Sequence, residues 1–145
     1  MIKINLSLLF EDISQRLSYI SGKRAADTND FFRHSLTDKD FPLIKNLADE
    51  SLCFIGAKAM DSGFSYTMTE EVIKIKFKKG FNPPPERLLY HLLLHCIIHR
   101  WLLITGLYHS TREDYKTEYF DNLFSHCFYQ ERSLGPLRPR FTPPL

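Results

Sequence analysis

This chain contains few cysteines and glycines, and its net charge is small. Its 145 residues include three cysteines (Cys53, Cys96 and Cys127), an odd number without a C-x-x-C pair. This spacing argues against a disulfide framework and favours reduced thiols. A formal net charge of +2 is too small to indicate that the whole surface of the protein attracts nucleic acid. The ordinary apolar share of 43% excludes a disordered or collagen-like chain, and the length fits one domain.

Enzyme and targeting signatures are also missing. The chain has no G-x-S-x-G, G-x-x-x-x-G-K-[ST] or G-x-G-x-x-G pattern. These patterns are the sequence signs of a nucleophile elbow, a phosphate-binding loop and a dinucleotide site. Glu11 and Asp12 interrupt the apolar N-terminal residues, which argues against a secretion signal. We therefore expect a protein without catalytic residues, cofactor or metal.

The longest apolar run, residues 88–107, approaches the roughly 20 residues that span a bilayer. It contains Arg100, and an arginine near the bilayer centre costs roughly 2.5–3.5 kcal/mol on insertion scales. The run also carries His91, His95 and His99 at four-residue spacing. We expect it to form a buried helix of a soluble protein, with no membrane partner.

The three histidines are the sharpest candidate for metal chemistry, because an i, i+4 pair on a helix can share one zinc ion. His91 and His99 would lie roughly 12 Å apart along a helix axis, too far to share one ion. No acidic residue follows His91 or His95 to complete an H-E-x-x-H pattern. We expect the imidazoles to meet water, backbone carbonyls or a neighbouring subunit. A small metal-binding helical protein or hydrolase that uses this stripe is the alternative.

Hydrophobic spacing predicts a mainly α fold, a four-helix bundle-like domain over residues 1–132. The aromatic share of 14% requires a well-filled core or surfaces that other proteins cover. Each predicted helix has a capping or proline signal at one end or both. The helices run from Leu6 to a cap at Gly22, from about Thr37–Asp40 to Asp61–Gly63, from the prolines 83–85 to about Thr105, and from the capping box Ser110–Glu113 onward.

Between the second and third helices the hydrophobic period changes to two. This change predicts a β-hairpin over residues 64–79, with a turn at residues 69–71. Two strands alone are marginal in water, so the apolar face must lie on the helices or join strands from another chain. The lysine face keeps the edge from aggregating, or it meets an acidic protein surface or nucleic-acid phosphate. The expected contact residues of the hairpin are Lys74, Lys76, Phe77 and Lys78.

Residues 133–145 are predicted to form an extended arm rich in proline and arginine. Proline sets the backbone in advance, so such an arm loses little entropy when it docks. Its arginines can pair with carboxylates of a groove. We expect the arm to bind a partner through Leu134, Leu137, Arg138, Arg140, Phe141 and Leu145.

This order of elements, with R-W-L-L-I-T-G at residues 100–106, a Tyr-rich amphipathic helix and a basic proline-rich tail, resembles head–tail connector (neck or adaptor) proteins of tailed bacteriophages. The resemblance implies a non-enzymatic structural protein of the virion neck, made in the host cytoplasm. Its protomers form a homo-oligomeric ring, commonly of twelve copies, below the portal.

The same resemblance assigns partners to parts of the chain. Residues 134–145 would dock the portal protein, and residues 64–79 would contact the ring, the tail or a second neck protein. DNA would pass through the lumen without sequence-specific binding. A nucleic-acid-binding module that uses Lys74, Lys76 and Lys78 is a further alternative.

Overall fold

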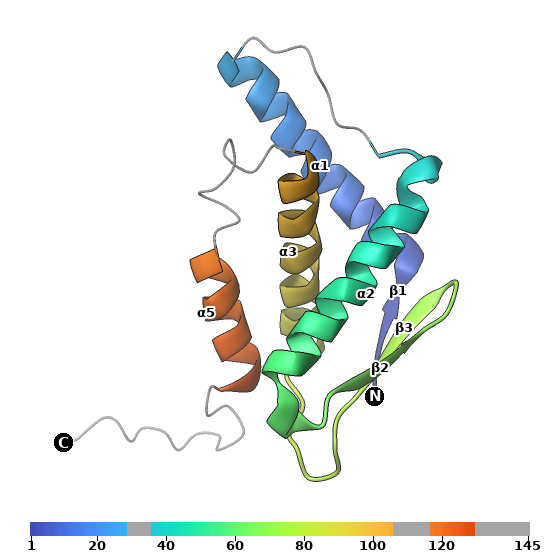
Figure 1. The fold of residues 1–145 in the computed structure, drawn as a ribbon, viewed down its shortest axis with the longest axis vertical. Coiled ribbons are helices and arrows are strands. Elements are labelled where there is room, and N and C mark those ends of the chain that lie inside the picture. The colour runs from blue at the N-terminus through green and yellow to red at the C-terminus, as the bar shows by residue number, and fades with distance from the viewer. Residues whose placement is uncertain (29–35, 106–116, 130–145) are drawn as a thin grey trace, which may run out of the picture.

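The computed structural model describes residues 1–28, 36–105 and 117–129, with the backbone alone at residues 19–28, 105, 117 and 118. These ranges hold four α-helices and a three-stranded antiparallel sheet (Figure 1). The predicted mainly α class, with a hairpin between the second and third helices, is confirmed. The elements are β1 (Ile2–Asn5), α1 (Leu6–Thr28), α2 (Phe41–Lys58), β2 (Ser65–Met68), β3 (Val72–Lys76), α3 (Glu86–Thr105) and α5 (Thr117–Phe128), with 3-10 turns at Asp38–Asp40 and Met60–Ser62.

Helix α3 is the centre of the core and contacts α1, α2 and α5 (Figure 1). Its apolar side chains are buried on nearly every side, as expected for a helix that other elements surround. By length and composition α3 could also cross a membrane. A helix in a protein core passes the same test, and α3 contributes most of its apolar side chains to the core of the described residues. Its fully buried residues are Leu89, Leu92, Leu93, Ile97, Ile98 and Leu102.

The sheet has the order β1-β3-β2, so the chain's own N-terminal segment supplies the third strand. This strand was not predicted from the sequence. The strand is only four residues long and passes directly into α1, so no turn residues mark its end. Its partner strand lies about 70 residues later in the sequence, with Ile2 opposite Ile75. The inner face of the sheet joins the helical core through Ile2, Ile4, Ile73 and Ile75.

Local capping fixes where several elements begin and end. Asn5 ends β1, and its Oδ1 accepts a hydrogen bond of 3.1 Å from the backbone N–H of Leu8 in the first turn of α1. The helix start that was predicted at Thr37–Asp40 is present, and these two residues form a capping box before α2. Gly63, at the predicted end of the second helical segment, has a left-handed backbone with φ 68°.

Two details of the helices differ from the prediction. Gly22 does not cap α1, which continues to Thr28. A glycine inside a helix costs only about 1 kcal/mol relative to alanine, so the flanking sequence decides whether the helix stops. In the predicted Tyr-rich amphipathic helix, Tyr119 is 50% exposed and so lies outside the buried face. The predicted start of that helix at residues 110–113 lies outside the described residues.

The abundant aromatic rings form a continuous row from the hairpin base to α5. Phe77 contacts Phe64 and Phe81, with ring centroids 5.7 and 5.5 Å apart. Both Phe77 and Phe81 lie near Phe128, and Phe128 packs on Phe124 at 4.8 Å. Large rings therefore fasten the short helix α5 to the base of the hairpin.

Candidate interaction surface on the sheet

The outer face of the three-stranded sheet carries a row of lysines. Lys3 on β1 lies directly opposite Lys74 on β3, and Thr67 on β2 lies opposite Lys74 on its other side. Lys76 is opposite Ser65 in the next row. Inward and outward residues alternate along these strands, so the lysines point away from the isoleucine face.

The register brings Lys3 and Lys74 close together. The backbone N–H of Leu6 donates a 2.9 Å hydrogen bond to the Glu71 carbonyl, which makes Leu6 and Glu71 a hydrogen-bonded pair. Pair types alternate along an antiparallel ladder, so Lys3 and Lys74 form a non-hydrogen-bonded pair, the type whose side chains lie nearest each other. Like charges at such positions destabilise a sheet. Within the described strands no acidic side chain on the same face offsets this repulsion.

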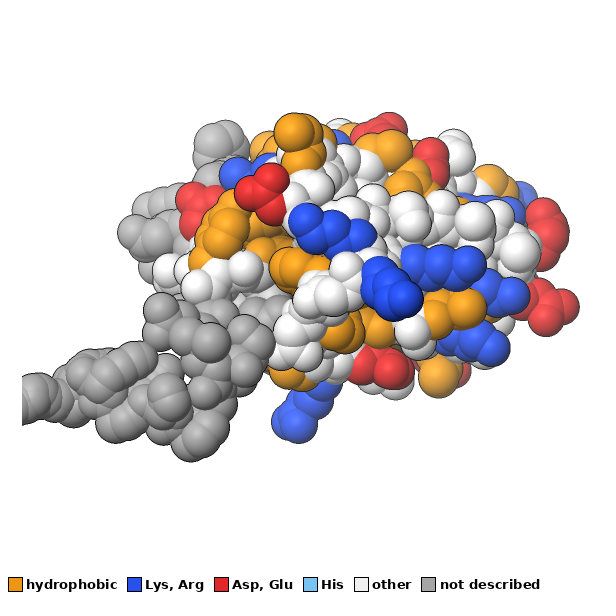
Figure 2. Space-filling model, turned by 90° about the horizontal axis from the view of Figure 1, so that it is seen from below, with side chains coloured by type: hydrophobic (Ala, Val, Ile, Leu, Met, Phe, Trp, Pro, Cys, Tyr) orange, Lys and Arg blue, Asp and Glu red, His pale blue; other side chains and the backbone are white. Residues whose placement is uncertain are grey.

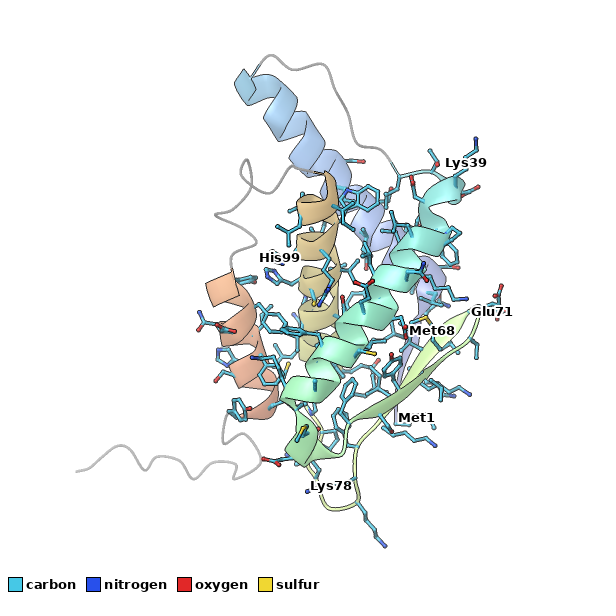
Figure 3. The ribbon with its side chains drawn as sticks, in the orientation of Figure 1. Met1, Lys39, Met68, Glu71, Lys78 and His99 are labelled. Atoms are coloured by element: carbon cyan, nitrogen blue, oxygen red, sulfur yellow. The ribbon has the colours of Figure 1, made fainter. Side chains whose placement is uncertain are left out.

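No acidic residue lies within the three described strands. Glu70 and Glu71 stand in the hairpin turn, where Glu70 pairs with Lys45 of α2 at 3.3 Å. Lys78 lies at the base of the hairpin, at the end opposite Glu71 (Figure 3). From below, Lys and Arg side chains gather on one side of the molecule around exposed apolar atoms (Figure 2). The sheet therefore offers a cationic, acid-free outer face.

The predicted contact residues fall into three groups. Lys76 and Lys78 are exposed and Lys74 is half-buried. Phe77 is half-buried and turned toward the aromatic row. The six arm residues Leu134, Leu137, Arg138, Arg140, Phe141 and Leu145 lie outside the described residues.

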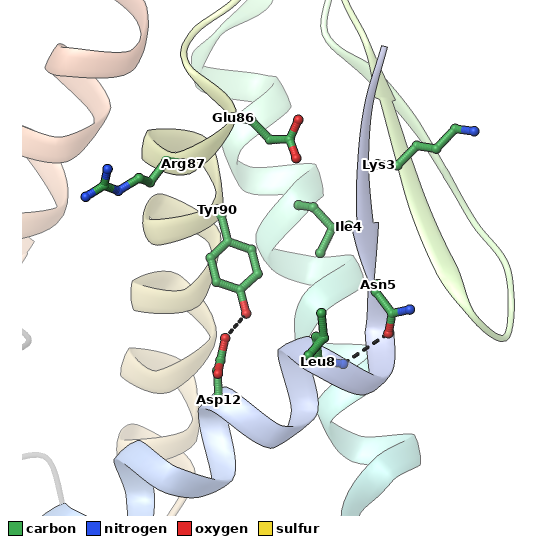
Figure 4. Close-up of a pocket in the computed structure, with 8 residues that line it drawn as sticks. All are labelled: Lys3, Ile4, Asn5, Leu8, Asp12, Glu86, Arg87 and Tyr90. Carbon is green, nitrogen blue, oxygen red and sulfur yellow. Dashed lines mark hydrogen bonds between the residues drawn. The ribbon is translucent and has the colours of Figure 1, made fainter.

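A pocket of about 490 Å³ lies between β1 and the first turns of α1 and α3 (Figure 4). At its inner end the hydroxyl of Tyr90 donates a hydrogen bond to the Asp12 carboxylate, which joins α3 to α1. Burial, and then the hydrogen bond to Asp12, raise the pKa of Tyr90 above its ordinary value, so the phenol stays protonated. The pocket is lined by Lys3, Ile4, Asn5, Leu8, Asp12, Glu86, Arg87 and Tyr90.

The central histidine of the α3 stripe, His95, faces α5 rather than solvent. His95 is buried, and its ring centroid lies 5.0 Å from that of Tyr119 and 6.3 Å from that of Phe120. The rings of His95 and His99 lie 6.3 Å apart in nearly parallel planes. A metal ion binds along a nitrogen lone pair in the ring plane, so parallel rings do not converge on one ion.

The electrostatics of His99 favour the neutral ring. Burial, and secondarily the nearby Arg100 charge, lower the pKa of His99 below its ordinary value of 6.5. Among the residues that the structure describes, no group of three His, Cys, Asp or Glu side chains is placed to hold a metal ion. The metal-binding alternative thus gains no support from the described part of the chain.

Two features of this surface were missed from the sequence: Lys3 and the open edge of β1. The only signal was the alternation in Ile2-Lys3-Ile4-Asn5, four residues long. Comparison with known protein families, curated proteins and solved structures finds no match to this chain.

Proposed function

We propose that this chain is a non-enzymatic structural subunit of a tailed-phage virion neck, where copies form a ring that joins the portal to the tail. The observation that carries the proposal is the lysine pair across β1 and β3. A sheet that places Lys3 opposite Lys74, with no acid on the same face, gives up stability in a way that an acidic protein partner would offset.

The rest of the proposed assignment follows the element order of the chain. The hairpin lies between the second and third helices, as in the connector proteins that the sequence resembles. In this proposal the cationic face of the sheet contacts an acidic surface of the adjacent ring or tail protein. Residues 134–145 dock the portal protein. The function is mechanical, because the ring turns the portal surface into a platform for the tail while DNA passes through.

The test is an assembly assay in the phage or prophage that carries the chain. The double variant Lys74→Glu/Lys76→Glu should leave DNA-filled heads without tails, seen by electron microscopy, and should lower the infectious titre. Lys39→Glu is the control for charge reversal, since it reverses one exposed lysine in the 3-10 turn before α2, off the sheet (Figure 3). Deletion of residues 134–145 should likewise stop incorporation of the chain into particles.

Circular dichroism of the purified variants checks that each one folds. The proposal fails if mass spectrometry finds no copies of the chain in purified virions. It also fails if the folded double variant yields tailed particles as often as the Lys39→Glu control.

A further inference from the structure

The outer side of β1 is an open strand edge. Within the described ranges, β1 pairs with β3 alone and ends the sheet. The hydrogen bond from Leu6 N–H to the Glu71 carbonyl sets the phase of the ladder. By alternation, the backbone groups of Ile2 and Ile4 point toward β3, and those of Lys3 and Asn5 point away. Asn5 directly precedes α1 and caps it, so its carbonyl accepts the first hydrogen bond inside that helix. The edge therefore presents two donors, the N–H groups of Lys3 and Asn5, and one acceptor, the carbonyl of Lys3.

The pocket beside β1 lies along this same edge. Lys3, Ile4 and Asn5 form one wall, and the first turns of α3 form the other (Figure 4). On the core side of the groove, Leu8 is 57% exposed although it is a large apolar residue. The groove thus combines free backbone groups on one side with an uncovered apolar contact on the core side.

A strand added to the β1 edge would meet different side chains on its two faces. On the outer face its nearest neighbours would be Lys3 and then Lys74, with no acid in the strands. On the inner face it would meet Leu8 and Tyr90, with Glu86 and Arg87 of the first turn of α3 beside them. The Asp12 carboxylate on this side accepts the hydrogen bond from Tyr90. Because side chains of a strand alternate between faces, the complementary segment alternates acidic and apolar residues.

We propose that the β1 edge is a strand-addition site that takes an extended segment of a partner protein with alternating acidic and apolar residues. Backbone hydrogen bonds to Lys3 and Asn5 supply affinity, and the alternating side chains supply specificity. A second copy is a poorer occupant, since edge-to-edge pairing would bring a lysine edge against a lysine edge. The chain's own arm is poorer too, because residues 134–145 hold two arginines and no acid.

Peptide binding at the β1 edge can be measured on the purified chain, independently of the virion assembly assay. The experiment uses the purified full chain and a fluorescent seven-residue peptide that alternates valine and glutamate. Comparison probes are the same peptide with lysine for glutamate, a peptide of residues 134–145, and a short DNA duplex. Fluorescence anisotropy measures affinity, and amide hydrogen exchange by NMR locates the contact. We expect the glutamate peptide to bind best and to slow exchange at the amides of Lys3 and Asn5.

Variants of Lys3 separate the backbone contribution from the charge. Lys3→Pro removes an outward N–H while leaving the ladder to β3 intact, and should raise the dissociation constant about tenfold, the factor for one amide hydrogen bond. Lys3→Thr keeps the N–H and loses the charge, so it should weaken binding of the glutamate peptide without abolishing amide protection. Lys3→Glu should reverse the preference toward the lysine peptide.

Four results would overturn the proposal. They are equal binding of the two charged peptides, glutamate-peptide binding that is unchanged in folded Lys3→Pro, tighter binding of residues 134–145 or of duplex DNA, and no protection at Lys3 and Asn5. If particles that carry Lys3→Pro assemble normally, the neck proposal stands and the β1 edge is not used in the virion. Peptide binding without incorporation into virions would leave the strand-addition site and remove the neck proposal.

Discussion

The hydroxyl of Tyr66 on β2 donates a hydrogen bond of 2.6 Å to the carboxylate of Asp49 on α2. The thiol sulfur of Cys53, also on α2, lies 3.0 Å from the same hydroxyl oxygen. Burial, and then the hydrogen bond to Asp49, raise the pKa of Tyr66 above its ordinary value. These contacts fasten one edge strand of the sheet to a helix, while the other edge strand, β1, borders a pocket.

Removal of this hydroxyl should weaken the fold. We expect Tyr66→Phe to lower the free energy of unfolding by about 1 kcal/mol, since Asp49 is exposed and water replaces the lost donor. Urea unfolding followed by circular dichroism measures the change. Tyr119→Phe is the control, because that ring is half exposed, and its effect should stay within about 0.5 kcal/mol. Equal losses in the two variants would contradict the role of the Tyr66 contact.

In an alkaline titration, two tyrosines should ionise at a higher pH than an ordinary tyrosine. The pKa values of Tyr66 and Tyr90 are both raised above 10.0, so the folded protein holds these protons when the unfolded chain has lost them. Their contribution to stability is full below pH 10 and falls as the pH rises above it. Tyrosinate absorbance should therefore show a fraction that ionises only with unfolding. Tyr66→Phe and Tyr90→Phe should each reduce that fraction, and an unchanged fraction in both would refute the assignment.

Acid should weaken the fold through His99. Its lowered pKa means that the unfolded chain binds a proton more readily than the folded protein. The stability contribution of the neutral ring is full above pH 6.5 and declines as the pH falls from 6.5 toward the lowered folded value. Thermal melts between pH 7.5 and 5 should show this decline, and His99→Gln should make it shallower. A parallel decline in the variant would assign the acid sensitivity to another group.

Gly63 should tolerate no side chain. Its backbone is left-handed, and an added Cβ would lie 2.4 Å from Lys78 Cβ and 2.8 Å from the Lys78 backbone nitrogen. Strain and overlap together should make Gly63→Ala cost about 3 kcal/mol. Gly80 also has a positive φ, but an added Cβ there meets nothing within 4 Å. Gly80→Ala should cost only about 1 kcal/mol, from backbone strain alone. Urea midpoints of the two variants compare these costs directly, and a similar loss in both would show that the Lys78 contact can relax.

Reversal of one charge on the sheet should stabilise the isolated chain. Lys3→Glu replaces a like-charge pair with an opposite-charge pair facing Lys74, and should raise the free energy of unfolding by about 0.5 kcal/mol at low salt. The gain should vanish near 1 M salt, because screening removes the interaction. Lys39→Glu, away from the sheet, should show no such salt-dependent gain. A destabilised Lys3→Glu variant would mean that the two lysines do not repel each other.

Much of the architecture was predictable because it depends on short-range patterns. The apolar face of α2 and the alternation of the hairpin are periodic over many residues, and the Thr37–Asp40 box and Gly63 act within a few positions. The end of α1 was missed, since one glycine at position 22 does not outweigh a helical context.

The amino-acid sequence by itself determined the helices, the hairpin and the separation of lysines from isoleucines along β3, because periodicity and capping act locally. Only the tertiary structure decided that Ile2–Asn5 pairs with β3 and that Lys3 therefore faces Lys74. It also decided that the outer edge of β1 borders a pocket formed with the first turns of α1 and α3. Pairing between segments some 70 residues apart depends on how the whole core packs, and no local pattern encodes it.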